Sequence, residues 1–374
     1  MTVAGAMALD RERRSAGDEW WRDAALMAAE PLQSGTPDNC GTYLIGRGLL
    51  QVETADQEAR DAIDRYYGEC ATNPGAGIPG VHCALRSADH GRLVRLDFLS
   101  GAPADPAASA LALLHPSPGE PPYAIERGEM PAWRLVGGRA RPLIAATGNC
   151  IIAERSRIPE DFVADYLISA ALEAQREILV VHAAALSAGG RGVLLTGASR
   201  TGKTTFSMHL AARGHRLLGD EMGLIHLPTR YLVPLRRAVR LRAGPREPSL
   251  AAALRRAGVV ERVAAGSRTG PVRIDRLFPA ADAVAAPLAA VFFLRGFAAV
   301  PSLEPFQPTL DDGDLFEAMS ANDIALISLG LAPARHALRL LALRRTLAHL
   351  PCWRLTLGSP DATARLVERT LEAL

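Results

Sequence analysis

A single lysine marks the stretch of this sequence with the clearest chemistry. Lys203 is the only lysine among forty-two basic residues, and all the others are arginines. It lies in "GASRTGKT", residues 197–204, which matches G-x-x-x-x-G-K-[ST] at every fixed position. The apolar run "RGVLL" precedes this stretch and the helix-like "KTTFSMHLAARG" begins within it, as the motif requires. These residues predict a loop that binds the phosphates of a nucleotide.

Each residue type in the loop suits that task. Glycines let the backbone curl so that successive N–H groups face an anion at the positive end of a helix. Thr204 can offer its hydroxyl to Mg²⁺. Lys203 can reach the β- and γ-phosphates as a compact point charge, which the planar guanidinium of arginine cannot do in the same way. The predicted nucleotide-binding residues are Gly197, Ala198, Ser199, Arg200, Thr201, Gly202, Lys203, Thr204 and Thr205.

Two carboxylates follow Lys203 at a distance of seventeen and eighteen residues, in the predicted strand "HRLLGDEMGLIHL". Asp220 and Glu221 at the tip of a strand beside the loop could hold Mg²⁺ or receive the proton of an acceptor. Upstream, His182 lies in the predicted buried strand "ILVVHAAAL". Adjacent strand ends could bring His182, Lys203 and Asp220 together around a γ-phosphate. A histidine that is merely satisfied within its strand is the alternative for His182.

Other classes of phosphate-loop protein fit the sequence less well. A Ras-type GTPase needs an N-K-x-D element to recognise guanine, and the chain has no second lysine to supply it. The L-S-G-G-Q signature of transporter ATPases is also missing from the sequence.

The run "VHAAALSAGGRGVLLTGASRTGKTTFSMHLAARGHRLLGDE" resembles the catalytic core of HPr kinase/phosphorylase. In that family a histidine strand, a P-loop and an R-G-H-R-L-x-x-D-[DE] strand follow in this order. The same order resembles, more distantly, ATP-dependent phosphoenolpyruvate carboxykinase. The segments "YLVPLRRAVRLR" and "CWRLTL" are similar to HPr-kinase-related proteins found beside peptide-modifying genes. The specific motifs cover about residues 178–242, and residues 1 to about 150 lie outside the resemblance.

The resemblance implies a role for each matched residue. Lys203 and the loop amides bind ATP, and Thr204 ligates Mg²⁺. Asp220 is the general base that takes the proton of an acceptor hydroxyl, with Glu221 as a metal ligand or its neighbour. His182 hydrogen-bonds near Asp220 and the γ-phosphate. A weak base suffices because phosphoryl transfer depends mostly on alignment and charge neutralisation.

Two arginines after the carboxylates, Arg237 and Arg242, are candidates for neutralising the transferred charge; a solvated basic strand face is the alternative. The sequence departs from the family at Glu221, where the bifunctional enzyme has a second aspartate, and at Arg200, where glycine is usual. The E-I-R-G-L-G signature of phosphorylase-capable enzymes is not found after the carboxylate strand. This argues against the reverse, dephosphorylating activity.

The elements that position these residues alternate between strand and helix. From about residue 156 we expect helices over 159–178, 203–214, 332–350 and from 359, and strands over 178–186, 191–197, 215–227, 288–297 and 352–357. Before that, the stretch "TYLIGRGLLQVE" predicts one or two strands, and Thr54 with Gln57 predicts a capping box at the start of a helix. The stretch "GRLVRLDF" predicts a half-buried strand, and residues 101–122 predict a long loop.

The predicted fold class is therefore α/β. A polar arm spans 1–35 and a smaller accessory α/β domain spans 36–155, where acceptor recognition could lie. Residues 156–374 form a P-loop kinase core of the HPr kinase/phosphoenolpyruvate carboxykinase type with a mixed sheet, an expectation that the resemblance supplies.

Composition limits the partners. The formal net charge of +2 favours neither nucleic acid nor an anionic membrane. The longest apolar run, "AAPLAAVFFL", is too short to cross a bilayer, and the N-terminus lacks a secretory signal. Five scattered cysteines without a C-x-x-C pair suit reduced thiols in the cytoplasm. The hexamers of HPr kinases allow a homo-oligomer, although no residue of this sequence identifies the contact.

Three functions stay open from the sequence. The leading one is an ATP- and Mg²⁺-dependent kinase that phosphorylates a hydroxyl, most simply serine, of a protein or peptide such as a precursor peptide or phosphocarrier. The second is a small-molecule kinase with a sugar, nucleoside or amino-acid acceptor. The third is a regulatory protein that binds ATP without catalysis, although pure binding requires no base such as Asp220.

Overall fold

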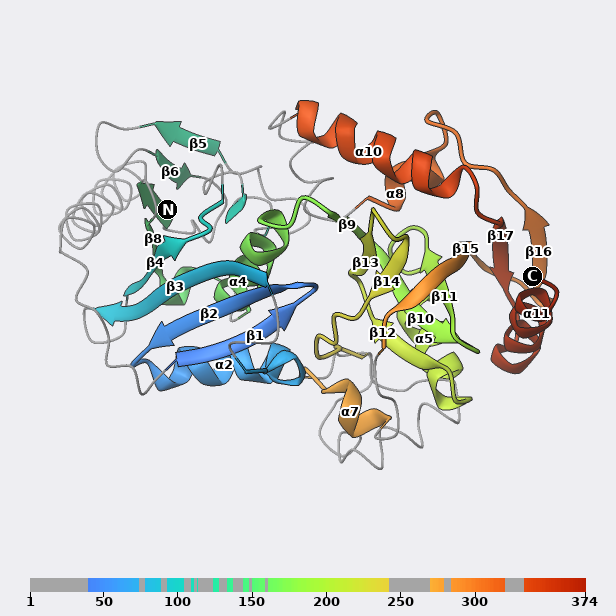
Figure 1. Cartoon of the computed structure of the whole chain (residues 1–374), viewed down its shortest axis with the longest axis horizontal. Helices are drawn as coiled ribbons and strands as arrows, with labels where there is room; N and C mark the ends of the chain where they lie inside the picture. The colour runs from blue at the N-terminus through green and yellow to red at the C-terminus, as the bar shows by residue number, and fades with distance from the viewer. Residues whose placement is uncertain are drawn as a thin grey trace, which may run out of the picture.

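The computed structural model is a mixed α/β protein built on two mixed β-sheets (Figure 1). The described residues are 40–73, 78–88, 93–103, 109–110, 113, 124–127, 133–136, 144–147, 150–158, 161–241, 270–278, 284–319 and 333–374. The predicted arm, residues 1–35, and most of the predicted loop at 101–122 lie outside them. Among the described residues, no helix combines the length and the apolar character needed to cross a membrane.

The first sheet has eight strands in the order β1-β2-β3-β4-β8-β7-β6-β5. All neighbouring pairs are antiparallel except β2 and β3. Gly46, with φ of 64°, supplies the left-handed residue of the tight β1–β2 turn. The strands are β1 Cys40–Ile45, β2 Gly48–Thr54, β3 Ile78–Ala88, β4 Leu93–Ser100, β5 Ala124–Arg127, β6 Trp133–Val136, β7 Ile144–Thr147 and β8 Cys150–Glu154.

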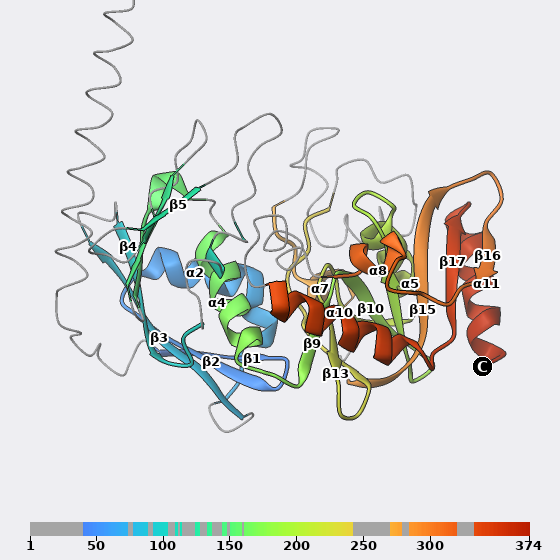
Figure 2. The ribbon, with the colours of Figure 1, turned by 90° about the horizontal axis from the view of Figure 1, so that it is seen from above.

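Two helices, α2 Gln57–Tyr67 and α4 Phe162–Glu173, lie on one face of this sheet (Figure 2). The α2 helix confirms the predicted helix that stops at Gly68, but its N-cap is Asp56 and not Thr54. The Asp56 carboxylate accepts a hydrogen bond from the Ala59 N–H (3.0 Å), while the Thr54 hydroxyl accepts one from the Asp56 N–H. Asp56 outcompetes the predicted capping box because its carboxylate already reaches the third helical residue.

The sequence correctly predicted a strand at β4, but the prediction that this strand is half-buried is wrong. Six consecutive residues, from Leu93 to Phe98, are buried. The polar face is buried because Arg95 and Asp97 neutralise each other: the Arg95 Nε lies 2.9 and 2.8 Å from the two carboxylate oxygens. An alternating pattern therefore does not guarantee a solvated face when the polar side chains pair.

The predicted boundary at residue 155 stays a prediction. The α4 helix follows that boundary in sequence, yet its side chains pack into the core of the first sheet. The same core includes Ile178 and Val180 of β9 and Leu224 of β13, which belong to the second sheet. The two sheets thus share buried apolar contacts.

The second sheet runs β12-β10-β11-β15-β14-β13-β9, with β17 beside β15 and β16 beside β17. Only the β11/β15 and β15/β17 pairs are parallel, so the predicted mixed sheet is confirmed. Its strands are β9 Ile178–Val181, β10 Ala183–Ala188, β11 Arg191–Thr196, β12 Arg216–Gly219, β13 Gly223–His226, β14 Tyr231–Val233, β15 Ala286–Phe297, β16 Ser302–Pro305 and β17 Cys352–Leu357.

Helices cover both faces of this sheet. Side chains of α5 Lys203–Ala212, α7 Ile274–Leu277 and α11 Pro360–Glu372 pack on one face, and those of α8 Gly313–Glu317 and α10 Pro333–Leu347 pack on the other. Figure 2 shows α5 and α10 on opposite sides of the strands. The central strand β15 sends Phe292 to the first face and Phe293 to the second, and both rings are fully buried. This explains its unbroken apolar run.

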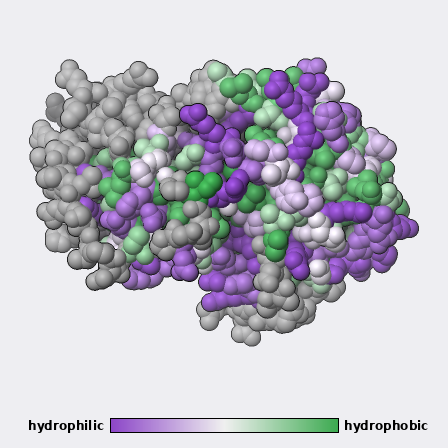
Figure 3. Space-filling model, in the orientation of Figure 1, coloured by the Kyte–Doolittle hydropathy of each residue, from purple (hydrophilic) through white to green (hydrophobic). Residues whose placement is uncertain are grey.

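Hydrophilic residues gather over α11 at the right of the space-filling view (Figure 3). The buried side of this helix consists of Thr363, Ala364, Val367 and Leu371, while Asp361, Arg365, Arg369 and Glu372 are exposed. The Ser359 N-cap makes no side-chain hydrogen bond; instead the Thr363 hydroxyl donates to the Ser359 carbonyl (2.9 Å) and accepts from the Gly358 N–H (3.0 Å). The predicted start of the helix is thus correct.

Two segments predicted as single strands are each divided in two. The 178–186 segment splits into β9 and β10 at His182, and the 215–227 segment splits into β12 and β13 at residues 220–222. His182 leaves the ladder because its N–H donates to the Ala318 carbonyl (2.9 Å) and its carbonyl accepts from the Thr196 hydroxyl (3.0 Å). Glu221 has φ of 62°, which no strand residue adopts. Both breaks occur at polar residues, His182 and Asp220.

Candidate functional site

The glycine-rich loop, residues 197–204, connects β11 to α5 at one edge of the second sheet. Gly197 has φ of 139°, and a Cβ there would lie 2.6 Å from the Leu294 carbonyl oxygen. Gly202 has φ of 101°, and a Cβ there would lie 2.8 Å from a Leu357 methyl carbon. Both glycines are therefore required by backbone conformation and by close approach.

The backbone of the loop leads directly into the N-terminus of α5. Gly202 is the N-cap, and no side chain caps the first turn. The Thr201 hydroxyl closes the loop internally by donating to the Ala198 carbonyl (2.8 Å). Arg200 has φ of 69° and is exposed. An uncapped helix N-terminus after a glycine-rich turn has N–H groups available for an anion.

Lys203 folds back over the loop. Its Nζ donates to the carbonyl oxygens of Gly197 (2.7 Å) and Ala198 (2.9 Å), and the residue is 8% exposed. Burial lowers the pKa of this ammonium, while the negative charges of Asp220, Glu221 and Glu317 oppose the shift. The single lysine of the chain is thus held at the mouth of the loop among three carboxylates.

Asp220 immediately follows β12 and is buried. Its Oδ1 atom is fully buried without a hydrogen-bond partner, although the Thr204 hydroxyl and the Glu221 N–H bond to the carboxyl group. Burial, followed by the charge of Glu221, raises the pKa of Asp220 to about 7, against the opposing effect of Thr204 and Lys203. A buried carboxylate oxygen without a partner is costly, which suits an atom that receives a ligand or a proton.

His182 reaches the same site from the start of β10. Ala183 of β10 is opposite Thr196 of β11, so His182 lies level with the beginning of the glycine-rich loop. Burial and then the charge of Lys203 lower its pKa, and a hydrogen bond to the Glu317 backbone partly offsets this. The imidazole is therefore held neutral at pH 7.

Sequence reasoning missed Glu317. It ends α8, its backbone bonds to His182, and its charge acts on Lys203. It lies far beyond the carboxylate strand in sequence, in "GDLFEAMS", and no local signal marks it. Only the docking of α8 beside β9, through the Val181–Met319 bridge, brings it to the site.

Arg237 pairs with a helix of the first sheet. Its Nη2 is 2.9 Å from an Asp165 carboxylate oxygen on α4, and its guanidinium carbon lies 5.7 and 5.9 Å from the ring centres of Tyr66 and Tyr67. Burial opposes its charged form, but Tyr67 and Asp165, and to a smaller extent Glu221, raise its pKa. This guanidinium is thus already paired. The other predicted arginine, Arg242, lies outside the described residues.

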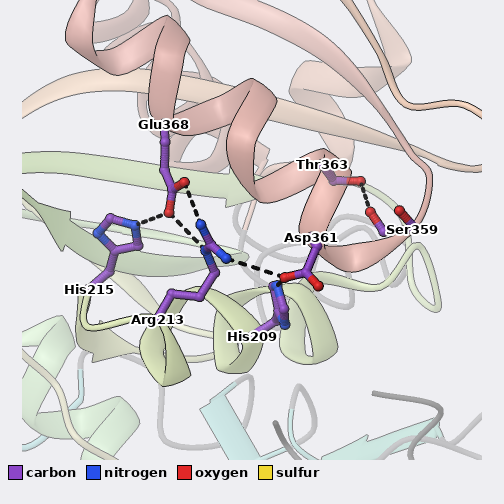
Figure 4. Close-up of polar contacts among 7 residues, drawn as sticks. All are labelled: His209, Arg213, His215, Ser359, Asp361, Thr363 and Glu368. Carbon is purple, nitrogen blue, oxygen red and sulfur yellow. Dashed lines mark hydrogen bonds and ion pairs between the residues drawn. The ribbon is translucent and has the colours of Figure 1, made fainter. Parts of the chain in front are cut away.

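Salt bridges to α11 fix the position of α5 (Figure 4). Glu368 accepts two hydrogen bonds from the Arg213 guanidinium (2.9 and 2.8 Å), and its carboxylate lies 3.1 Å from the His215 Nε2. Asp361 lies 3.2 Å from Arg213 and 3.4 Å from His209. These contacts hold the C-terminal end of the helix whose N-terminus forms the loop.

The residues at the loop include oxygen atoms of the kind that bind Mg²⁺. In the parts of the chain that the structure describes, no cluster of three or more His, Cys, Asp or Glu side chains forms a metal site. Mg²⁺ on a nucleotide typically uses only one or two protein groups and completes its shell with phosphate oxygens and water. Thr204 and the unpartnered oxygen of Asp220 are the right kind of donors, with Glu221 next to them.

Compared with known proteins, the chain matches no protein-family model and no curated protein sequence.

All five cysteines are free, as the sequence predicted. Taken together, an uncapped helix N-terminus, an ammonium, a buried carboxylate and an imidazole lie at one edge of the sheet. That set can bind a polyphosphate and accept a proton beside it.

Proposed function

We propose that this protein is an ATP- and Mg²⁺-dependent kinase that transfers the γ-phosphate to a hydroxyl, most simply that of a serine in a protein or peptide. The observation that supports this most is that Lys203, held over the glycine-rich loop, lies within the electrostatic influence of the buried Asp220, whose Oδ1 lacks a partner. The class of acceptor rests on the resemblance to HPr kinases, which covers this same stretch of sequence.

The loop and Lys203 would bind the phosphates. The N–H groups at the start of α5 face an anion without competition from a capping side chain. The Lys203 Nζ now bonds to two neutral carbonyl oxygens. It can exchange these bonds for stronger, charge-assisted ones to phosphate oxygens.

Asp220 would act as the general base. The acceptor hydroxyl gives its proton to the carboxylate while its oxygen forms a bond to the γ-phosphorus. The bond from that phosphorus to the β,γ-bridging oxygen breaks, and ADP leaves with the electron pair. Thr204 and Glu221 are the residues that would hold Mg²⁺, with Asp220 beside them, and the charge of the ion would offset that of the phosphates.

His182 would act as a positioning residue beside Lys203 and would not carry the proton. Its lowered pKa keeps the ring neutral, and its bond to the Glu317 backbone fixes the ring beside Lys203. A neutral imidazole near the ammonium avoids a second positive charge and leaves Lys203 free for the phosphates.

The test measures ATP binding by calorimetry and transfer by labelling. Wild type, Lys203→Ala and the control Arg365→Ala, which removes an exposed cation of α11, are incubated with γ-labelled ATP and Mg²⁺. The acceptors are serine-containing peptides, including those encoded by neighbouring genes, and small hydroxyl compounds, namely sugars, nucleosides and amino acids. We expect the wild type and Arg365→Ala to label a peptide and Lys203→Ala to lose this activity.

Labelling by Lys203→Ala at the wild-type rate would contradict the proposal. Tight ATP binding by the wild type without transfer to any peptide or small hydroxyl compound would point instead to a nucleotide-binding regulatory protein. Transfer to the small compounds alone would assign a small-molecule kinase.

A further inference from the structure

The strand order of the second sheet gives the glycine-rich loop two different flanks. The edge carries, in turn, the end of β12, the start of β10, the loop after β11, the end of β15 and the end of β17. Asp220 and His182 lie on the β12 and β10 side of the loop. Phe297 and Leu357 lie on the opposite side, at the ends of two strands parallel to β11.

Phe297 lies beyond the end of β11 along the strand direction, because β15 is longer than its neighbour at this edge. Thr196, the last residue of β11, is opposite Phe293 of β15, so β15 continues for four more residues beside the loop. The strand is irregular between Leu294 and Phe297, where Gly296 has φ of 102°. Ala298 then donates its N–H to the Leu357 carbonyl (2.8 Å), which fixes the backbone immediately after Phe297.

The Phe297 ring lies against the loop. A Cβ on Gly202 would lie 2.9 Å from the Cζ atom of this ring, so the ring contacts the residue just before Lys203. The residue is nevertheless 69% exposed, whereas Phe292 and Phe293 of the same strand are fully buried. The backbone thus holds an aromatic face beside the phosphate-binding residues and in contact with solvent.

The two flanks of the loop differ in chemistry, and this difference sets the direction in which a nucleotide would lie along the loop. The charged and proton-accepting groups Lys203, Asp220 and His182 define the end where the terminal phosphate belongs. A nucleoside triphosphate in that orientation runs along the loop towards the ends of β15 and β17, where Phe297 and Leu357 lie. Bases stack on aromatic rings with little dependence on the identity of the base.

We propose that the ring of Phe297 is the platform on which the base of the bound nucleotide stacks. This inference rests on the proposed function, because it places the base of the same ATP molecule. Contact with Gly202 and the bond from Ala298 to Leu357 preorganise the ring, so that it need not be ordered when the nucleotide binds.

The experiment compares ATP with inorganic tripolyphosphate, which has the phosphates but no base. Dissociation constants of both are measured by calorimetry with Mg²⁺ on the whole chain. The variants are Phe297→Ala, Phe297→Trp, Lys203→Ala and the control Leu338→Ala, which removes an equally exposed apolar side chain of α10. Thermal melting of each variant verifies folding.

We expect Phe297→Ala to weaken ATP binding by about tenfold, from the loss of one base–aromatic stack, and to leave tripolyphosphate binding unchanged. Phe297→Trp retains ATP affinity because it keeps an aromatic face, and Leu338→Ala behaves as the wild type. Lys203→Ala loses affinity for both ligands.

Two results would overturn the platform while leaving the phosphate site intact: wild-type ATP affinity in Phe297→Ala, or an equal loss of ATP and tripolyphosphate binding in that variant. A wild type that binds neither ligand would instead overturn the proposed function together with the platform. The comparison with tripolyphosphate thus separates the two failures.

Discussion

At the scale of single residues, Asp220 combines two properties that oppose each other. Its burial without a partner for Oδ1 raises its pKa to about 7, far above the ordinary 3.8 of the side chain. A carboxylate with such a pKa is a better base than an exposed one near neutral pH. The same burial destabilises the folded state once the group ionises.

The first prediction concerns the pH dependence of transfer. Asp220 can accept a proton only when ionised, so kcat/KM should rise with pH up to about 7 and then level off. Asp220→Asn should lose transfer at every pH while it still binds ATP. Steady-state kinetics between pH 5 and 9 test this. A wild-type profile without an acidic limb, or an active Asp220→Asn, would contradict the role of base.

The second prediction concerns stability at the same residue. Between pH 3.8 and about 7 the folded state keeps a proton that the unfolded state has released, so stability falls as pH rises through this window. Asp220→Asn removes this loss and should be more stable than the wild type at pH 8, by roughly 1–4 kcal/mol, with little difference at pH 4. Urea unfolding at both pH values measures it. Equal stabilities at pH 8 would mean that Asp220 is not destabilised by burial.

At the scale of elements, α5 depends on α11 for its position. Glu368 of α11 receives two bonds from Arg213 and one contact from His215, both at the C-terminal end of α5. These bonds, chiefly those from Arg213, lower the pKa of Glu368. The stabilisation is therefore present above about pH 4.5, the ordinary value, and is lost as the pH falls through the lowered pKa.

The third prediction is that Glu368→Gln lowers the free energy of unfolding by about 1 kcal/mol at pH 7, since the pair is bidentate but partly exposed. The control is Glu372→Gln, which changes an exposed carboxylate of the same helix. Denaturant unfolding at pH 7 and pH 3 provides the measurement, and the difference between Glu368→Gln and wild type should shrink at pH 3. Equal losses in both variants would show that the contact does not anchor α5.

At the scale of the whole molecule, the segment after β14 joins the two sheets. Ala238 donates its N–H to the Tyr66 carbonyl (2.8 Å), and Arg237 pairs with Asp165 of α4 (2.9 Å). Arg237 lies also under the influence of Glu221 beside the glycine-rich loop. The buried guanidinium of Arg237 therefore interacts both with α4, which packs on the first sheet, and with the charge of Glu221 in the candidate site.

The fourth prediction is that Arg237→Met destabilises the protein by about 3–5 kcal/mol, because it leaves Asp165 buried without its charged partner. The double variant Arg237→Met/Asp165→Leu should recover much of this loss. Arg240→Met, which removes a more exposed pair with Asp161 (3.2 Å), should cost about 1 kcal/mol or less. Unfolding midpoints measure all three. Similar small losses for both single variants would show that the Arg237 pair is not a buried junction.

The sequence by itself determined the features whose signals are local. The glycine-rich loop, the strand before it and the helix after it follow from residues 191–214, because glycine conformations and helix ends depend on neighbours in the chain. The alternation of strand and helix in the C-terminal half is likewise confirmed. The Asp56 cap was missed because neighbouring polar side chains compete for the backbone N–H groups at a helix start. The break at His182 was missed because its partners, the Ala318 carbonyl and the Thr196 hydroxyl, come from other parts of the chain.

Tertiary structure alone decided how the site is assembled. The sequence placed Asp220 at a strand end, but only packing buries its Oδ1 and raises its pKa. Glu317 and Phe297 reach the loop from distant parts of the chain, through the docking of α8 and the parallel pairing of β15 with β11. Desolvation and charge interactions depend on all atoms nearby in space, and contacts between distant segments leave no pattern in either segment.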